Sequence, residues 1–313
     1  MRLFSFAVLT GLIAIAAPLL AQRGPAPFTI VESGQGFARL DQAVRAVGDG
    51  SATIVIAPGS YRQCAVQERG SIIYRAAEPG TAVLSGTACE QKAALVLRGR
   101  SAVVDGLVFE NIAVPDGNGA GIRIEEGDLD VVNAMFRDSE EGILSASDPS
   151  GTIRVDHSTF SGLGRCDRDL DCAHSIYVGR YGALEVTRSR FERGTGGHYV
   201  KSRAPRVLIA DSSFDDSAGR GTNYMIDLPA GARGEIARNV FVQGEDKENW
   251  SAFLAVGAED IRNPSAGLAV HGNRATLAPG VDRNTFFVAD WSGEALRIAA
   301  NELGEGIALF DRR

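Results

Sequence analysis

The hexapeptide Val155-Asp156-His157-Ser158-Thr159-Phe160 is the most informative part of the sequence, because similar hexapeptides recur along most of the chain. Most copies begin with an aliphatic residue and carry Ser or Asn two positions before a final large apolar residue. The copies end at Phe109, Phe136, Phe160, Phe191, Phe214 and Phe241, with weaker ones at Ala275 and Leu303. Successive ends lie 23 to 34 residues apart. A repeat of this length is typical of a solenoid, and we expect the Phe side chains to stack inside it.

A second short apolar segment precedes each copy, and turn residues separate the two. These segments are residues 121–124, 142–145, 175–178, 199–202, 225–228 and 252–255. No stretch of ten residues between the segments has the apolar pattern of a helix, which excludes βαβ units. Stacked units of short strands bury one continuous core and pair each strand with its equivalents above and below. The sequence therefore predicts an all-β fold, a right-handed parallel β-helix.

Other repeat folds fit less well. A leucine-rich repeat needs the pattern L-x-x-L-x-L and Asn ladders, which we take to be missing, and a propeller needs about forty residues per blade. A β-sandwich stays as the alternative, since it too consists of short strands and turns.

The N-terminal region supports the solenoid. Residues 37–47 have the apolar spacing of an amphipathic helix, which we expect to cover the open end as a cap, and residues 54–61 form a strand and turn. The pattern G-F-A-x-L-x-x-A-V…I-V-I-A-P-G-x-Y resembles the opening of exported proteins of the pectate-lyase-like β-helix superfamily. The resemblance implies this fold for one domain, residues 22–313. It also implies activity on polysaccharides, although such motifs identify architecture better than activity.

Residues 1–21 have the pattern of a cleavable signal peptide, with Arg2 before an apolar stretch that Pro18 interrupts. An uncleaved anchor is the alternative. We expect export to the periplasm or beyond, with no membrane insertion after cleavage. The four cysteines then predict disulfides Cys64–Cys89, one turn of the solenoid apart, and Cys166–Cys172. A metal site of these cysteines is disfavoured because no CxxC pair is present.

The net charge of −7 argues against a nucleic-acid partner. It leaves room for a local basic groove, and with three lysines in the whole chain, Lys201 is conspicuous. We expect a monomer.

Alternation along the second apolar segments predicts one outward face that gathers polar side chains from neighbouring turns. The predicted column is Arg123, Tyr177, Lys201 and Asp227, flanked by His174, His198, Arg203 and Tyr224. If Tyr199 rather than Val200 were the inward residue, Lys201 would turn into the core, at a high cost for a charge. A plain solvated face is the alternative to a site. Farther along the chain, Asn249 and Trp250 are additional candidates for sugar binding. The acidic residues of the same region are fallback candidates for the site: Glu245, Asp246, Glu248, Glu259 and Asp260.

The resemblance to this superfamily implies a lyase that acts on an acidic, uronate-containing polysaccharide by β-elimination. Lys201 is then the expected base. Arg203 is the expected charge neutraliser or acid partner, and His198, His174 or Tyr177 is the expected second proton-transfer group. Arg123, Tyr224, Asp227, Asn249 and Trp250 are the expected substrate-binding residues.

The acidic loop is a candidate cation site. Asp167, Asp169 and Asp171 alternate inside the second disulfide loop and predict a Ca²⁺ site, with a solvated loop as the alternative. Two other functions stay open. A glycoside hydrolase needs two carboxylates, and Asp227 has no evident partner on adjacent turns. A non-catalytic carbohydrate-binding or envelope protein needs no reacting groups.

Overall fold

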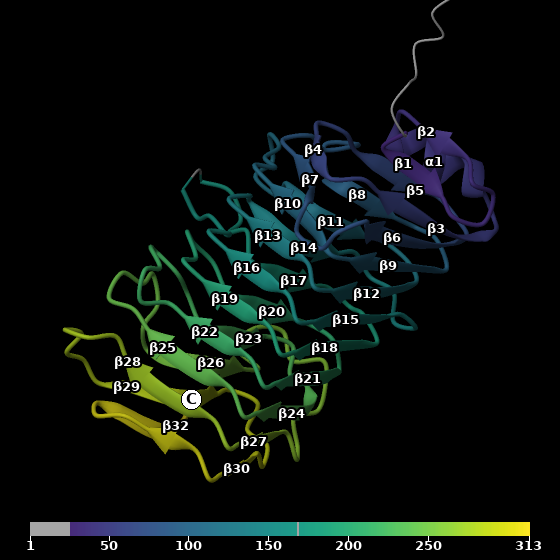
Figure 1. Ribbon diagram of the computed structural model, residues 1–313. Helices are drawn as coiled ribbons and strands as arrows, with labels where there is room; N and C mark the ends of the chain where they lie inside the picture. Colours follow the sequence, from purple (N-terminus) through teal and green to yellow (C-terminus); the bar gives the residue numbers. More distant parts are fainter. Residues whose placement is uncertain (1–25, 168) are drawn as a thin grey trace, which may run out of the picture.

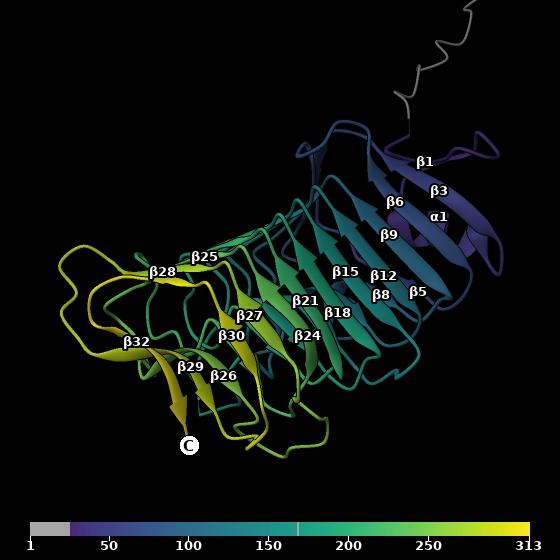
Figure 2. The ribbon, with the colours of Figure 1, turned by 90° about the horizontal axis from the view of Figure 1, so that it is seen from below.

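The computed structural model describes residues 26–167 and 169–313, so the predicted signal peptide lies outside the described residues. The chain forms a parallel β-solenoid of about nine turns with almost no helix, which confirms the predicted fold class. Figures 1 and 2 show the strands stacked along one axis, from the purple N-terminal end to the yellow C-terminal end. Each complete turn contributes one strand to each of three sheets.

Strands that are neighbours in the following order are hydrogen-bonded within each sheet. The first sheet consists of β2 (Gly36–Phe37), β1 (Phe28–Ile30), β3 (Ser51–Ile56), β6 (Ser71–Ala76), β9 (Ser101–Asp105), β12 (Asp128–Val132), β15 (Thr152–Asp156), β18 (Ala183–Thr187), β21 (Arg206–Ala210), β24 (Arg233–Ala237), β27 (Ala269–His271) and β30 (Arg297–Ala299). The second sheet consists of β4 (Gly59–Tyr61), β7 (Ala82–Ser85), β10 (Leu107–Glu110), β13 (Met135–Arg137), β16 (Thr159–Ser161), β19 (Arg190–Glu192), β22 (Ser213–Asp215), β25 (Val240–Gln243), β28 (Arg274–Leu277) and β31 (Glu302–Leu303). The third sheet consists of β5 (Ala65–Gln67), β8 (Ala93–Leu97), β11 (Ala120–Ile124), β14 (Glu141–Ser145), β17 (Ile176–Val178), β20 (Val200–Ser202), β23 (Ile226–Leu228), β26 (Ala252–Val256), β29 (Thr285–Asp290) and β32 (Ile307–Arg312).

The repeated hexapeptide is not one strand but contains parts of two strands from different sheets. A residue with φ between +45° and +74° lies between these strands, where the chain turns from the first sheet to the second. These corner residues are Gly106, Asn133, His157, Arg188, Asp211, Arg238, Gly272 and Ala300. Most are not glycine, so the solenoid maintains a left-handed conformation that L-residues adopt rarely.

The phenylalanines of the hexapeptides form an internal column, as predicted. All six are buried, and neighbouring rings stack in parallel with centroids 4.7–4.9 Å apart. The register of the second sheet aligns each Phe with the next and continues the column through Ala275 to Leu303. The column therefore fixes the register of successive turns.

A polar ladder runs beside this column, at the residue after each corner from His157 onward. The backbone N–H of Ser189 donates to Ser212 Oγ, that of Ser212 to Asn239 Oδ1, and that of Asn239 to Asn273 Oδ1, at 3.0 Å each. The Asn273 amide also donates to the Ile236 carbonyl. Our interpretation that the chain lacks an Asn ladder was wrong, since Asn239, Asn273 and Asn301 form one. These residues are 34 and 28 positions apart, so the ladder does not stand out in the sequence.

The helix α1 (Leu40–Val47) covers the N-terminal end. It is shorter than the predicted helix because Phe37 belongs to β2 and pairs with Phe28 of β1. Leu40, Ala43 and Val44 are buried against the first turns, and Figure 2 shows α1 at that end of the solenoid. The helix thus acts as the predicted cap.

Both predicted disulfides are present. Cys64–Cys89 links neighbouring turns across 25 residues, and Cys166–Cys172 closes a loop of six. Disulfides of this kind are typical of proteins outside the cytoplasm. Across the described ranges, no helix has the length and apolarity that a membrane span requires.

Candidate active site

The outward face of the third sheet has the predicted register. Val200 pairs with Ile176 and Ile226, so Lys201 lies on the outer face between Tyr177 and Asp227. Arg123 belongs to the same column, but Leu144 of β14 separates it from Tyr177. The predicted column therefore exists, with one apolar residue inside it that alignment of the segments had passed over.

The two histidines lie on adjacent turns and contact each other. His174 Nδ1 accepts from the backbone N–H of His198 at 3.0 Å, and the two Nδ1 atoms are 3.3 Å apart. These contacts assign the Nδ1 proton to His198, since His174 Nδ1 is already an acceptor. Burial, followed by the nearby Lys201 charge, lowers the pKa of His174 to about 3, and burial holds the pKa of His198 well below its usual value. Both rings are thus neutral near pH 7.

Gly197 is required for this contact. It has φ +60°, and a Cβ there would lie 2.1 Å from the Ala173 carbonyl oxygen and 2.6 Å from His174 Nδ1. A larger residue would push the two turns apart at the histidines. The glycine-rich segment 194–197 therefore lets the histidine turns approach.

Lys201 and Arg203 both bind the carboxylate of Glu259. Lys201 Nζ donates to Glu259 Oε1 at 2.7 Å, and Arg203 Nη2 donates to Glu259 Oε2. Arg203 Nε also donates to the Tyr177 hydroxyl at 3.1 Å. Partial burial alone would raise the pKa of Glu259, but the hydrogen bonds from Lys201 and Arg203 outweigh it and lower that pKa. Two cations of the face thus hold one carboxylate from the loop after β26.

Asp227 lies deeper, beneath Lys201 and His198. Its Oδ2 is 3.5 Å from Lys201 Nζ and 3.5 Å from His198 Nε2, while its Oδ1 is buried and has no hydrogen-bond partner within the described residues. Burial raises the pKa of Asp227 to about 6, although Lys201 acts in the opposite direction. Asp227 therefore changes charge in the pH range where many enzymes work.

These groups line a cleft of about 590 Å³, which we call the lysine cleft. Its walls are Asp171, Cys172, His174, Tyr177, Gly197, His198, Lys201, Arg203, Asn223, Tyr224, Asp227, Glu248, Asn249, Ala258, Glu259 and Trp291. All five predicted catalytic residues line it, as do the predicted binding residues Tyr224, Asp227 and Asn249. Arg123 lies in a neighbouring cleft instead, and Trp250 is about half exposed and lines neither.

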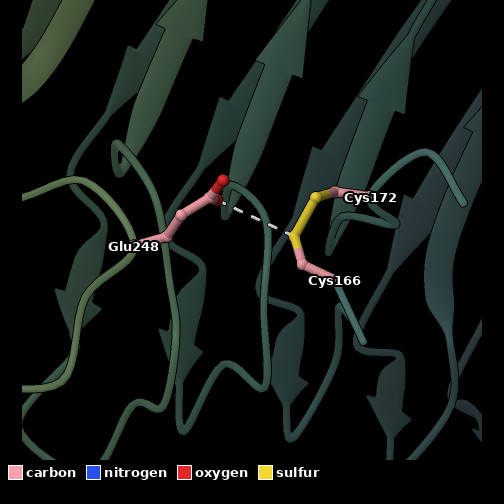
Figure 3. Close-up of side chains that lie close together, drawn as sticks. All are labelled: Cys166, Cys172 and Glu248. Atoms are coloured by element: carbon pink, nitrogen blue, oxygen red, sulfur yellow. Dashed lines mark hydrogen bonds between the residues drawn. A yellow bond between two sulfur atoms is a disulfide. The ribbon is translucent and has the colours of Figure 1, made fainter. Parts of the chain in front are cut away.

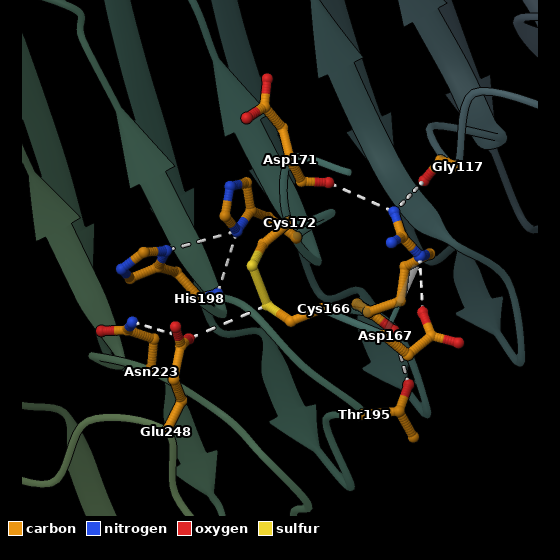
Figure 4. Close-up of a disulfide and its surroundings, with 12 residues drawn as sticks. Gly117, Cys166, Asp167, Asp171, Cys172, Thr195, His198, Asn223 and Glu248 are labelled. Carbon is orange, nitrogen blue, oxygen red and sulfur yellow. Dashed lines mark hydrogen bonds and ion pairs between the residues drawn. A yellow bond between two sulfur atoms is a disulfide. The ribbon is translucent and has the colours of Figure 1, made fainter. Parts of the chain in front are cut away.

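The loop closed by Cys166–Cys172 forms one wall of the cleft. The buried Arg165 holds it: its Nε donates to Asp167 Oδ1 at 2.8 Å and its Nη1 to the carbonyls of Asp171 and Gly117, as Figure 4 shows. Across the cleft, Glu248 Oε2 accepts from Asn223 Nδ2 and lies 3.8 Å from Cys166 Sγ. Figure 3 shows Glu248 directed at the disulfide. The disulfide therefore positions a wall that carries Asp171.

The predicted Ca²⁺ ligands do not converge in this arrangement. Asp167, Asp169 and Asp171 are all exposed, and Asp167 binds Arg165. Among the described residues, the potential metal ligands whose ligand atoms lie within 4.8 Å of one another are Cys166, Cys172 and Glu248. The two sulfurs of this group form a disulfide. Disulfide sulfurs are not thiolate ligands, so this group does not suit a metal. The Ca²⁺ site stays a prediction.

Several residues of the cleft were not singled out as site residues from the sequence. Glu259 had been noted only as a fallback candidate, and Asn223 and Trp291 were missed. They come from turns and loops outside the repeated strands, where periodicity gives no signal. Only the position of Trp291 directly after β29, on the same face as Tyr224, could have pointed to it.

The fold and the cleft together define the class of this protein: a parallel β-helix with a charged groove on one sheet. No protein-family model matches the chain, and no curated protein does. Among solved structures, ORF18 of Geobacillus virus E2 aligns with a TM-score of 0.50 at 13% identity over 87% of this chain, which spans 55% of the viral protein. An alginate lyase from Paenibacillus sp. str. FPU-7 aligns with a TM-score of 0.47 at 16% identity, over 87% of this chain and 94% of the lyase. The likeness to ORF18 shows the fold alone.

Proposed function

We propose that the protein is a polysaccharide lyase that cleaves a uronate-containing chain in the lysine cleft by β-elimination. The observation that carries the proposal is the contact of the Glu259 carboxylate with both Lys201 and Arg203. Two cations that already hold a carboxylate in an open cleft provide the geometry that a uronate carboxylate needs. Glu259 then occupies the place of the substrate's acid group, and the substrate displaces it.

The chemistry requires three groups. Arg203 binds the uronate carboxylate and neutralises it, which makes the adjacent C5–H more acidic. Lys201, released from Glu259, accepts the C5 proton through its amine nitrogen. The C4–O bond breaks as the C4–C5 double bond forms. Tyr177 gives its proton to the departing oxygen, and the hydrogen bond from Arg203 strengthens it as a donor.

A second candidate function is glycoside hydrolysis. Asp227 had no evident carboxylate partner in the sequence, but Glu259 now approaches the same Lys201 Nζ, at 2.7 Å against 3.5 Å for Asp227. A glycoside hydrolase needs two carboxyl groups beside the bond that it cleaves. Asp227 and Glu259 are such a pair, and the pKa of Asp227 is raised to about 6. For a hydrolase Glu259 is a reacting group, whereas in a lyase it competes with the substrate.

Substitution of Glu259 separates the two functions. The protein is incubated with polygalacturonate, alginate and glycosaminoglycan uronates, and both the ultraviolet absorbance of the new double bond and the new reducing ends are followed. For a lyase, Glu259→Gln frees the cations and lowers KM by about two- to fivefold, as expected for the loss of a half-exposed ion pair. Double bonds and reducing ends appear in equal numbers.

Other results assign the second candidate or neither. Reducing ends without absorbance, together with loss of turnover in Glu259→Gln, would establish hydrolysis. A matched control is Glu192→Gln, which removes an acidic residue from β19 of the second sheet, away from the cleft. No product from any of these polymers, with binding retained, would favour the non-catalytic function.

A further inference from the structure

A second cleft adjoins the lysine cleft on its N-terminal side. It encloses about 630 Å³ and shares Asp171, Cys172, Tyr177 and Arg203 with the lysine cleft. Among the described residues, four arginines and two carboxylates line it. The arginines are Arg123, Arg180, Arg203 and Arg262, and the carboxylates belong to Asp171 and Asp260. We call it the arginine cleft. An excess of guanidinium groups in a concave surface is a site for anions, in a protein whose net charge is −7.

Arg203 is bound to Glu259 and Arg262 to Asp260, whereas Arg123 and Arg180 retain capacity for a ligand. Arg123 Nε is buried and makes no hydrogen bond to any described residue. Its nearest carboxylate, Glu125 Oε1, is 3.7 Å away and already accepts from Lys92 Nζ at 2.8 Å. A buried N–H without an acceptor is costly, so a ligand oxygen that reached it would remove that cost. Arg180 is exposed at the rim of the same cleft.

The two clefts lie in line along the solenoid axis. Arg123 is on β11 and Lys201 on β20, and the turns of β14 and β17 lie between them. Three steps between parallel strands amount to about 14 Å. Only a ligand of several linked units can occupy both clefts at once, and each unit that reaches the arginine cleft must be acidic to match it.

We propose that the arginine cleft is a subsite for the carboxylates of further uronate units, so that the protein binds an extended acidic oligosaccharide along the solenoid axis. This inference rests on the proposed function, because it takes the lysine cleft as the place of cleavage. The subsite provides affinity that grows with oligomer length, and it selects polymers in which uronates follow one another over polymers in which they are sparse.

The test measures binding separately from turnover. Lys201→Ala protein is titrated by calorimetry with galacturonate and mannuronate oligomers from two to eight units long. Affinity should rise with length for at least one series, and the rise should shrink at high salt, which screens half-exposed charges. Adding Arg180→Gln and Arg262→Gln should then weaken binding of the longest oligomer by roughly tenfold or more, while the disaccharide loses much less. Arg233→Gln, an equal loss of charge per residue on the first sheet, is the matched control.

The outcomes are distinct. Affinity independent of length, or a double variant that binds the longest oligomer as tightly as its parent, overturns the subsite. An equal loss in Arg233→Gln also overturns it, since net charge rather than the cleft would then act. If the native protein produces no double bonds from any uronate polymer but shows the length-dependent, arginine-dependent binding, the lyase proposal fails and the subsite stands.

Discussion

Lys201 differs from the other two lysines in what surrounds it. The Lys247 side chain is fully buried and donates to Asp216 Oδ2 at 3.0 Å and to Thr222 Oγ1, so it links two turns. Lys92 bridges Glu90 and Glu125 at the surface of an earlier turn. Lys201 lines the lysine cleft, which neither of the others does, and it contacts the Glu259 carboxylate there. Its amine is therefore the one placed to react.

Replacement of Lys201 tests this role. Lys201→Ala should reduce turnover about 100-fold or more, because a general base contributes about that much, while the solenoid stays folded. Lys201→Arg should not restore activity, since Arg does not give up its proton. Turnover on the uronate polymer and thermal unfolding are measured together, with Lys92→Ala as the control. Near-normal turnover of the Ala variant would rule out Lys201 as the base.

A second prediction for a single residue concerns pH. Glu141 is buried, neither oxygen has a hydrogen-bond partner within the described residues, and burial raises its pKa well above 4.5. The unfolded chain releases this proton first, so stability falls as pH rises above about 4.5. Glu141→Gln should therefore match the native protein at pH 4 and exceed its stability by about 1–3 kcal/mol at pH 8. Denaturant unfolding at both values measures this.

The neighbouring residue is the matched control. Glu140 Oε2 accepts from the backbone N–H groups of Val114 and Gly119, so Glu140→Gln should destabilise rather than stabilise at pH 8. A Glu141→Gln variant that is less stable than the native protein at pH 8 would mean that the carboxylate has a favourable role there.

The sequence was sufficient to place the strand residues of the site and insufficient for the rest. Tyr177, Lys201 and Asp227 could be aligned because alternation and stacking apply to every turn. The partner of Lys201 could not be foreseen, because Glu259 reaches it from a loop whose path no repeat determines. The same holds for Arg180 and Arg262, which line the arginine cleft from turns that differ in length.

Among the elements, the Phe column explains why turns of unequal length remain in register. Each ring from Phe136 to Phe214 contacts the rings one turn above and below, so insertions must leave the solenoid before the next Phe. The column was readable in the sequence, but the corner inside each hexapeptide was not. Gly106, Gly272 and Asn133 have residue types that favour positive φ, whereas Arg188 and Ala300 give no such sign.

Truncation of one ring measures the strength of the column. Phe214→Ala should lower the free energy of unfolding by about 3–5 kcal/mol, since it leaves a cavity between two stacked rings. Val240→Ala in the adjacent strand is the control, because that side chain is largely exposed and should cost less than about 1 kcal/mol. Denaturant unfolding at equilibrium distinguishes them, and a loss under about 1 kcal/mol for Phe214→Ala would contradict an internal column.

Across the whole molecule, the two disulfides have different tasks. Cys64–Cys89 fastens the first turns near the cap, whereas Cys166–Cys172 shapes the wall that the two clefts share. Removal of the first by paired Ser substitutions should cost about 3 kcal/mol of stability with little change in oligouronate affinity. Removal of the second should reduce the free energy of oligouronate binding by more than it reduces the free energy of unfolding. Calorimetric unfolding and binding titrations are compared, and equal effects of both pairs on affinity would contradict this division.

Because the turns repeat at about 4.8 Å along the axis, the groove can change length without a change in its reacting groups. A duplicated turn inserted between β11 and β14 would move Arg123 one step farther from Lys201 and leave every contact among His174, His198 and Asp227 as it is. In a globular enzyme such an insertion would disturb the core on all sides, whereas here each turn contacts only its neighbours. If the protein is the proposed lyase, the size of its preferred oligosaccharide and the reaction performed on it can therefore evolve as independent traits.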